Sequence, residues 1–237
     1  MKKVFEKYET FCCLNLIVLY LVINSFCINK FGMLDYRTCL TNTLISFGLV
    51  LLMLVLDRTK YYGLTRIKNS KKYLYFIPLL LIPTVNLWNG ININNTNQEI
   101  LFHIVNMLNV GFIEEIIFRG FLFKMMEKSN VKTAIIVSSL TFGVGHIINL
   151  LNGAEFIQTI IQIGYATAIG YLFVIIFYKS KSLIPCIITH SLTNSLSIFN
   201  VDNNISLYIA PIFLIIIPTI YAMYINNKVK GEKEWKN

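Results

Sequence analysis

The stretch GFIEEIIFRGFLF, residues 111–123, places two carboxylates and one guanidinium in a run that is otherwise suited to lipid. A charged side chain at the centre of a single membrane helix costs roughly 2.5–3.5 kcal/mol on insertion scales, so a simple anchor would not carry three of them. Glu115 and Arg119 are one helical turn apart, which predicts an ion pair that fixes this helix and tunes the local field. Glu114 points about 100° away from Glu115 in an α-helix and stays available for chemistry.

The composition around this stretch is that of a membrane protein. The chain has 237 residues, of which 55% are hydrophobic and 14% charged, and its mean hydropathy is +0.61. Apolar runs near the length needed to cross a bilayer recur along the whole sequence. We therefore expect an all-α, polytopic membrane protein with a polar catalytic layer in the membrane, built as a single integral membrane domain over residues 1–237. About eight transmembrane helices are predicted, at residues 10–28, 39–56, 73–88, 99–126, 133–150, 155–178, 183–199 and 205–225.

The distribution of charge predicts how these spans are oriented. The formal net charge is +9, but the basic residues form short clusters between apolar runs, so no nucleic acid partner is expected. If there are eight spans, 18 of the 21 Lys and Arg residues fall on one side of the membrane. The positive-inside rule then predicts a multi-pass protein of the cell membrane with cytoplasmic N- and C-termini. The five cysteines have no metal-ligand spacing and are interpreted as small hydrophobic residues: Cys12, Cys13, Cys27, Cys39 and Cys186.

Further polar residues recur at a similar depth in three of the predicted spans. At about 1.5 Å of rise per residue, Glu114, His146 and His190 lie roughly 15, 21 and 14 Å from the cytoplasmic ends of their helices. Asn194 follows His190 by four residues, and Phe142 precedes His146 by four, so each pair shares one helix face. We expect these side chains to meet slightly on the cytoplasmic side of the membrane midplane.

This set of residues predicts hydrolysis of a carbonyl compound. Glu114 is expected to accept a proton from a water molecule that His146 holds. His190 and Asn194 are expected to donate hydrogen bonds to the oxyanion of a tetrahedral intermediate. His103 lies on the Glu114 face, but roughly 16 Å further towards the outer surface, and is interpreted as structural.

Other interpretations remain open. Glu114, His146 and His190 also match the ligand set of many catalytic zinc sites, with the second glutamate as base. No HExxH motif occurs, and we favour a reaction without a metal cofactor, with a divalent metal such as zinc as the alternative. A non-catalytic immunity or binding protein, or a small transporter, could also hold buried polar groups in a membrane. Gly164 and Gly170 are expected to let helices approach closely.

Three segments of the chain resemble the motifs of a known family. EEIIFR (residues 114–119), FGVGH (142–146) and HSLTN (190–194) are similar to the patterns EExxxR, FxxxH and HxxxN of the CPBP intramembrane proteases, also called the CAAX protease and bacteriocin-processing or Abi family. Each pattern is weak alone, but their order on successive late spans is specific. The resemblance covers residues 110–198.

The resemblance implies a membrane-embedded endopeptidase related to the enzyme that removes the last three residues of prenylated CAAX proteins. It assigns water activation to Glu114 and His146, and the oxyanion site to His190 and Asn194, while some members have been classed as metalloproteases. The abundance of Ile, Asn and Lys is typical of a bacterial protein. By analogy, the partners would be the lipid bilayer and a peptide or membrane-protein substrate, in maturation of a secreted or signalling peptide or in bacteriocin self-immunity.

Overall fold

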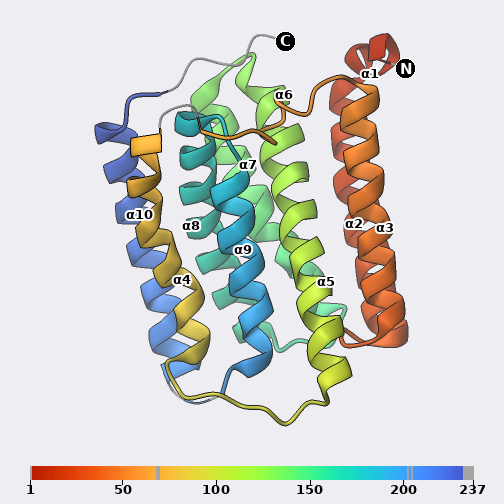
Figure 1. Cartoon of the computed structure of the whole chain (residues 1–237), viewed down its shortest axis with the longest axis vertical. Helices are drawn as coiled ribbons and strands as arrows, with labels where there is room; N and C mark the ends of the chain where they lie inside the picture. The colour runs from red at the N-terminus through yellow and green to blue at the C-terminus, as the bar shows by residue number, and fades with distance from the viewer. Residues whose placement is uncertain (1, 68–69, 202, 204, 232–237) are drawn as a thin grey trace.

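The fold is a bundle of long helices that run side by side (Figure 1). The structure is a computed structural model that describes residues 2–67, 70–201, 203 and 205–231. These residues contain helices and no strands, which confirms the predicted all-α class. Met1 and residues 232–237, which belong to the predicted single domain, lie outside the described residues.

Eight helical rods in the described part of the chain overlap the residue ranges of the eight predicted spans, and membrane crossing by all eight stays a prediction. In chain order they are α2 (Glu9–Phe31); α3 (Tyr36–Val55); η1, α4 and η2 (Ser70–Leu80, Leu81–Thr84, Val85–Leu87); α5, η3 and α6 (Asn97–Glu115, Ile116–Phe123, Lys124–Glu127); α7 and η4 (Val131–Gly145, His146–Leu150); α8 (Phe156–Ser180); α9 and η5 (Ile184–Leu196, Ser197–Phe199); and η6 and α10 (Ile205–Ile209, Ala210–Lys228). The short helix α1 (Lys2–Lys7), which the sequence did not predict, precedes them.

The rods differ in their fitness to span a bilayer. Six of those described are long and apolar enough to cross a membrane, so the chain is a multi-pass membrane protein. The third rod is a shorter apolar helix, Leu74–Leu87, and α9 has only 13 residues. Pro78 lies inside η1 and Pro83 inside α4, where a missing N–H and a bulky ring disfavour a regular α-helix. This explains why the third rod is largely a 3₁₀-helix.

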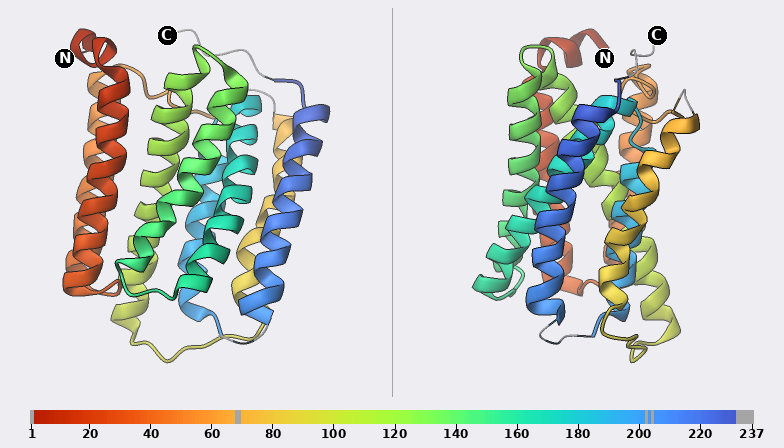
Figure 2. Two further views of the ribbon diagram at one scale, coloured as in Figure 1. Left: turned by 180° about the vertical axis from the view of Figure 1, so that it is seen from behind. Right: turned by 90° about the vertical axis from the view of Figure 1, so that its left-hand side faces the viewer.

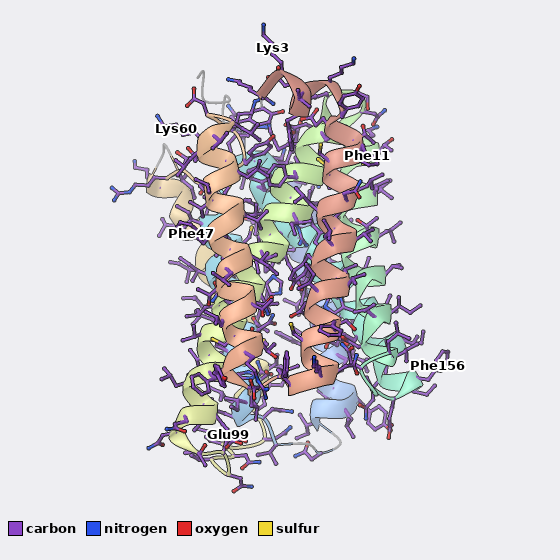
Figure 3. The ribbon with its side chains drawn as sticks, turned by 90° about the vertical axis from the view of Figure 1, so that its right-hand side faces the viewer. Lys3, Phe11, Phe47, Lys60, Glu99 and Phe156 are labelled. Atoms are coloured by element: carbon purple, nitrogen blue, oxygen red, sulfur yellow. The ribbon has the colours of Figure 1, made fainter. Side chains whose placement is uncertain are left out.

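The helices that carry the predicted site residues lie in the middle of the bundle. Figure 2 shows the α2–α3 hairpin at one edge of the bundle and α10 with α4 at the other, while α5, α7, α8 and α9 lie between them. In Figure 3, Phe11 and Phe47 point away from the bundle, and each is 68% exposed. Large apolar side chains exposed along whole helices indicate surfaces that face lipid.

Two glycines bring the central helices into backbone contact. A Cβ on Gly111 of α5 would lie 2.8 Å from the backbone nitrogen of Ser191 on α9, and one on Gly143 of α7 would lie 2.8 Å from the carbonyl oxygen of Ile163 on α8. From the sequence, Gly164 and Gly170 were the glycines expected to let helices approach closely. Of these, Gly170 is tightly enclosed, with Arg119 Nη2 at 3.1 Å, whereas Gly164 has only an ordinary contact at 3.5 Å.

Candidate active site

The stretch with the three charged residues contains a change of helix type. α5 ends at Glu115, and the chain continues as the π-helix η3, all eight residues of which are buried. π-Helices are rare and frequently occur at functional sites, because the wider turn frees backbone groups and shifts side chains. Ser138 Oγ of α7 donates a hydrogen bond of 2.9 Å to the carbonyl oxygen of Phe118, within this wider helix. The α-geometry assumed from the sequence is therefore wrong for residues 116–123.

The predicted ion pair nevertheless forms. Arg119 Nη1 donates to Glu115 Oε1 at 3.2 Å, and both side chains are fully buried. The Arg119 guanidinium also lies 4.0 Å from the centroid of the Phe142 ring and 5.8 Å from that of Phe173. An ion pair buried away from water is stable only if its geometry and surroundings compensate for the loss of hydration. Here the Phe142 and Phe173 rings near the guanidinium contribute to that compensation.

Glu115 has a second contact that the sequence did not reveal. Its Oε1 atom accepts a hydrogen bond of 2.9 Å from Nδ1 of His190 on α9. Because a carboxylate paired with Arg119 acts as an acceptor, the hydrogen of the His190 ring is assigned to Nδ1. The other ring nitrogen, Nε2, lies 3.6 Å from Glu114 Oε2. Glu115 therefore sets the orientation of His190 so that Nε2 faces the proposed base.

His146 is oriented by its own helix. α7 ends at Gly145, and His146 begins the 3₁₀ segment η4. Its Nδ1 atom donates to the carbonyl oxygen of Phe142 at 2.9 Å, which leaves the lone pair of the neutral ring on Nε2. The Phe142 ring contacts both imidazoles edge to face, with centroids 5.2 Å from His146 and 5.6 Å from His190.

All four residues predicted to be catalytic line one cavity. Glu114, His146, His190 and Asn194 contribute to its wall together with Phe142, and its volume is about 310 Å³. Glu115 and Arg119 lie behind this wall, fully buried. Further amide and hydroxyl side chains line the cavity: Asn24, Asn86, Asn149, Gln162, Tyr165, Thr193 and Ser197. The structure thus brings the predicted site residues together, while their chemical roles remain predictions.

Two contacts near the site come from residues that were not expected to take part in catalysis. Tyr20 of α2 donates from its hydroxyl group to Glu114 Oε1 at 3.0 Å. A tyrosine in the middle of an apolar run needs a partner for its hydroxyl, and this need was the only signal in the sequence. His103 is buried, and its Nε2 lies 3.1 Å from the carbonyl oxygen of Asn194, which agrees with the structural role expected for it.

The comparison with known proteins bears on this same segment. Residues 96–196 match the model of the family described as type II CAAX prenyl endopeptidase Rce1-like. The Rce1-like model is one of the CPBP family, so this match, which covers less than half of the chain, agrees with the resemblance carried by the three motifs. The match runs from the N-cap of α5 at Thr96 to the last residue of α9, so it includes all three motifs. The matched description is that of an endopeptidase, so the match supports a hydrolase embedded in a membrane. No curated protein and no solved structure shows a significant match to the chain.

A metal centre would need three or more suitable ligands close together. Within the described residues, no three His, Cys, Asp or Glu side chains gather closely enough to hold a metal ion. Glu114 and His190 approach each other, and His146 uses Nδ1 for a backbone carbonyl. Because that contact keeps Nε2 of His146 available as a ligand, the preference for a reaction without a metal stays a prediction.

Proposed function

We propose that the protein is a metal-independent intramembrane endopeptidase whose nucleophile is a water molecule activated by Glu114. The observation that carries this proposal is the shared cavity: a carboxylate, two imidazoles and an amide from α5, η4 and α9 line it together. They do so inside a segment that matches the model of a protease family. General bases and oxyanion donors must lie within hydrogen-bond reach of the same substrate carbonyl, and a common cavity provides this.

Attack on the peptide would use Glu114 and His146. Glu114 Oε2 takes a proton from the water as its oxygen forms a bond to the peptide carbonyl carbon, and the carbonyl π-electrons move to oxygen. His146 Nε2 accepts the second hydrogen of the water as a hydrogen bond and so directs the oxygen lone pair. The tautomer of His146 supports this role, because its Nδ1 hydrogen is occupied by the Phe142 carbonyl.

The oxyanion would be stabilised by α9. The Asn194 amide donates one hydrogen bond, and a proton on His190 Nε2 donates another. Since Nδ1 of His190 already donates to Glu115, a second ring proton makes the ring an imidazolium, which the neighbouring Glu115 carboxylate stabilises. When the intermediate collapses, the C–N bond breaks, and the proton on Glu114 passes to the leaving amine. This step restores the Glu114 carboxylate.

The shape of the cavity supports a peptide that enters from the outer side. All residues of η3 are buried and Lys124 is 2% exposed, so packed side chains lie between the site and the Lys-rich end of the bundle. The cavity instead extends to Met33 and Ser197, which are exposed at the opposite end. Figure 3 shows Lys3 and Lys60 at one end and Glu99 at the other. With the Lys-rich end cytoplasmic, the substrate would be a peptide or membrane-protein segment outside a bacterial cytoplasm, as in maturation of a secreted or signalling peptide or bacteriocin self-immunity.

The test is a comparison of cellular peptides. Cells without this protein are supplied with the wild type, with Glu114→Gln or with Glu155→Gln, a carboxylate control at the exposed start of α8. New peptide ends quantified by mass spectrometry are expected with the wild type and the control and not with Glu114→Gln. Purified wild type is expected to keep its activity in a chelator. Equal peptidomes for wild type and Glu114→Gln would point to a binding protein, and loss of activity in the chelator would point to a metal enzyme.

A further inference from the structure

We propose that Tyr20 is a positioning residue of the active site, by which the N-terminal hairpin α2–α3 holds the Glu114 carboxylate in its working orientation. This inference rests on the proposed function, because it concerns the same base. Tyr20 lies outside residues 96–196, the segment that matches the protease family, so none of the three motifs includes it. It would make α2 a necessary part of the site, although the motifs lie on other helices.

The contact with Tyr20 gives the two oxygens of the Glu114 carboxylate different partners. The Tyr20 hydroxyl donates to Glu114 Oε1 at 3.0 Å, whereas Oε2 faces His190 Nε2 at 3.6 Å. A phenol donating to a carboxylate forms a charge-assisted hydrogen bond, which is stronger and more directional than a neutral one. With Oε1 held in this way, the carboxylate cannot rotate freely, and Oε2 remains directed at the cavity where the water would lie.

The position of Tyr20 is fixed by a buried amide network. Asn24 follows Tyr20 by one turn of α2, on the same face, and lines the cavity. The Asn42 amide of α3 donates to Asn24 Oδ1 and to Asn106 Oδ1 of α5, both at 2.8 Å. Asn42 is 1% exposed and Asn106 is fully buried. Buried polar networks of this kind specify one packing of their helices, so this network fixes how α2 faces α5.

If Tyr20 had only a structural role, removal of its hydroxyl would affect stability and not turnover. Tyr20 is 2% exposed, and a buried hydroxyl group needs some partner whether or not it takes part in a reaction. If its role were only to satisfy that need, its removal would lower stability and leave the turnover of the folded enzyme unchanged. If it positions Glu114, its removal lowers kcat and leaves KM unchanged, because the hydroxyl contacts the base.

The experiment uses the full chain in lipid nanodiscs and a mixture of internally quenched peptides of randomised sequence. We expect Tyr20→Phe to lower kcat by about tenfold to a hundredfold, the range that one hydrogen bond to a charged group gives, with KM within about twofold of the wild type. Tyr171→Phe is the matched control, since it removes a hydroxyl from a partly buried tyrosine of α8 that does not line the cavity. It is expected to retain wild-type kcat.

A double-mutant cycle separates this inference from the proposed function. In the Glu114→Gln background, adding Tyr20→Phe is expected to change the residual rate no further, because no general base remains for the hydroxyl to position. Wild-type kcat in Tyr20→Phe, or effects of the two changes that add, would overturn the role of Tyr20 while leaving Glu114 as the base. A wild-type rate in Glu114→Gln would instead overturn the proposed function, and with it the role of Tyr20.

Discussion

At the scale of single residues, Glu115 connects more groups than its sequence spacing indicated. The four-residue interval to Arg119 correctly predicted their ion pair, because both residues are on one turn of a helix. The bond from Glu115 to His190 joins residues 75 positions apart. Such a contact depends on how α5 and α9 pack and cannot be inferred from either motif alone.

This double role gives a prediction that separates stability from activity. Glu115→Gln leaves the buried Arg119 without a counter-charge, and we expect it to lower the free energy of unfolding by about 3–5 kcal/mol. Measured as chemical unfolding in detergent, most of this loss should return in the double variant Glu115→Gln/Arg119→Met, which carries neither charge.

Activity should not return with stability. The double variant still lacks the carboxylate that orients His190 and stabilises its imidazolium, so we expect peptide hydrolysis to stay at least about tenfold below the wild type. A double variant that is both stable and fully active would contradict the role given to Glu115.

At the scale of elements, the sequence predicted the rods better than their internal geometry. Apolar runs revealed where each of the eight rods lies, because a helix that is buried or faces lipid must be built mainly from apolar residues. The π-helix over Ile116–Phe123 was not visible, since its hydrophobic pattern equally suits an α-helix. The close approach at Gly111 and Gly143 was also missed, because a glycine shows its use only when the facing helix is known.

The α7–α8 contact provides a matched pair of glycine variants. Gly143→Ala would place its Cβ 2.8 Å from the carbonyl oxygen of Ile163, so α7 must move away from α8. We expect a clear fall in melting temperature and in hydrolysis, because α7 leads directly into η4, which places His146 in the cavity. Gly164→Ala meets only Ile215 Cδ1 at 3.5 Å and is the control.

The control should behave differently for a stated reason. Alanine favours a helix over glycine by about 1 kcal/mol, so Gly164→Ala is expected to be neutral or slightly stabilising and fully active. Equal losses in the two variants, measured by thermal unfolding in detergent, would show that packing at Gly143 has no special importance.

At the scale of the whole molecule, charge and depth together anticipated where the site lies. The sequence placed Glu114, His146 and His190 at similar depths on different helices, and the structure brings them to one cavity. The sequence could not show which residues lie between the site and the Lys-rich end. That depends on the complete burial of η3 between the neighbouring helices, which is a property of the assembled bundle.

The orientation of the bundle can be measured with thiol labelling in intact cells. In a background without native cysteines, Asn94→Cys lies in the exposed loop before α5, and Ser129→Cys in the exposed loop after α6. We expect an impermeant maleimide to label the former directly and the latter only after permeabilisation, because the positive-inside rule places the Lys-rich loops in the cytoplasm. The reverse pattern would contradict entry of the substrate from outside.

The central claim is that a single carboxylate inside the bilayer converts water into the nucleophile. Its most direct measurement is the turnover of internally quenched peptides by purified Glu114→Gln and wild type, reconstituted side by side in the same lipid. General-base catalysis contributes about 10²–10⁴-fold, so a loss of at least that size is predicted, with folding and lipid insertion unchanged. Turnover by Glu114→Gln within twofold of the wild type, a range we take as about the error of such assays, would contradict it.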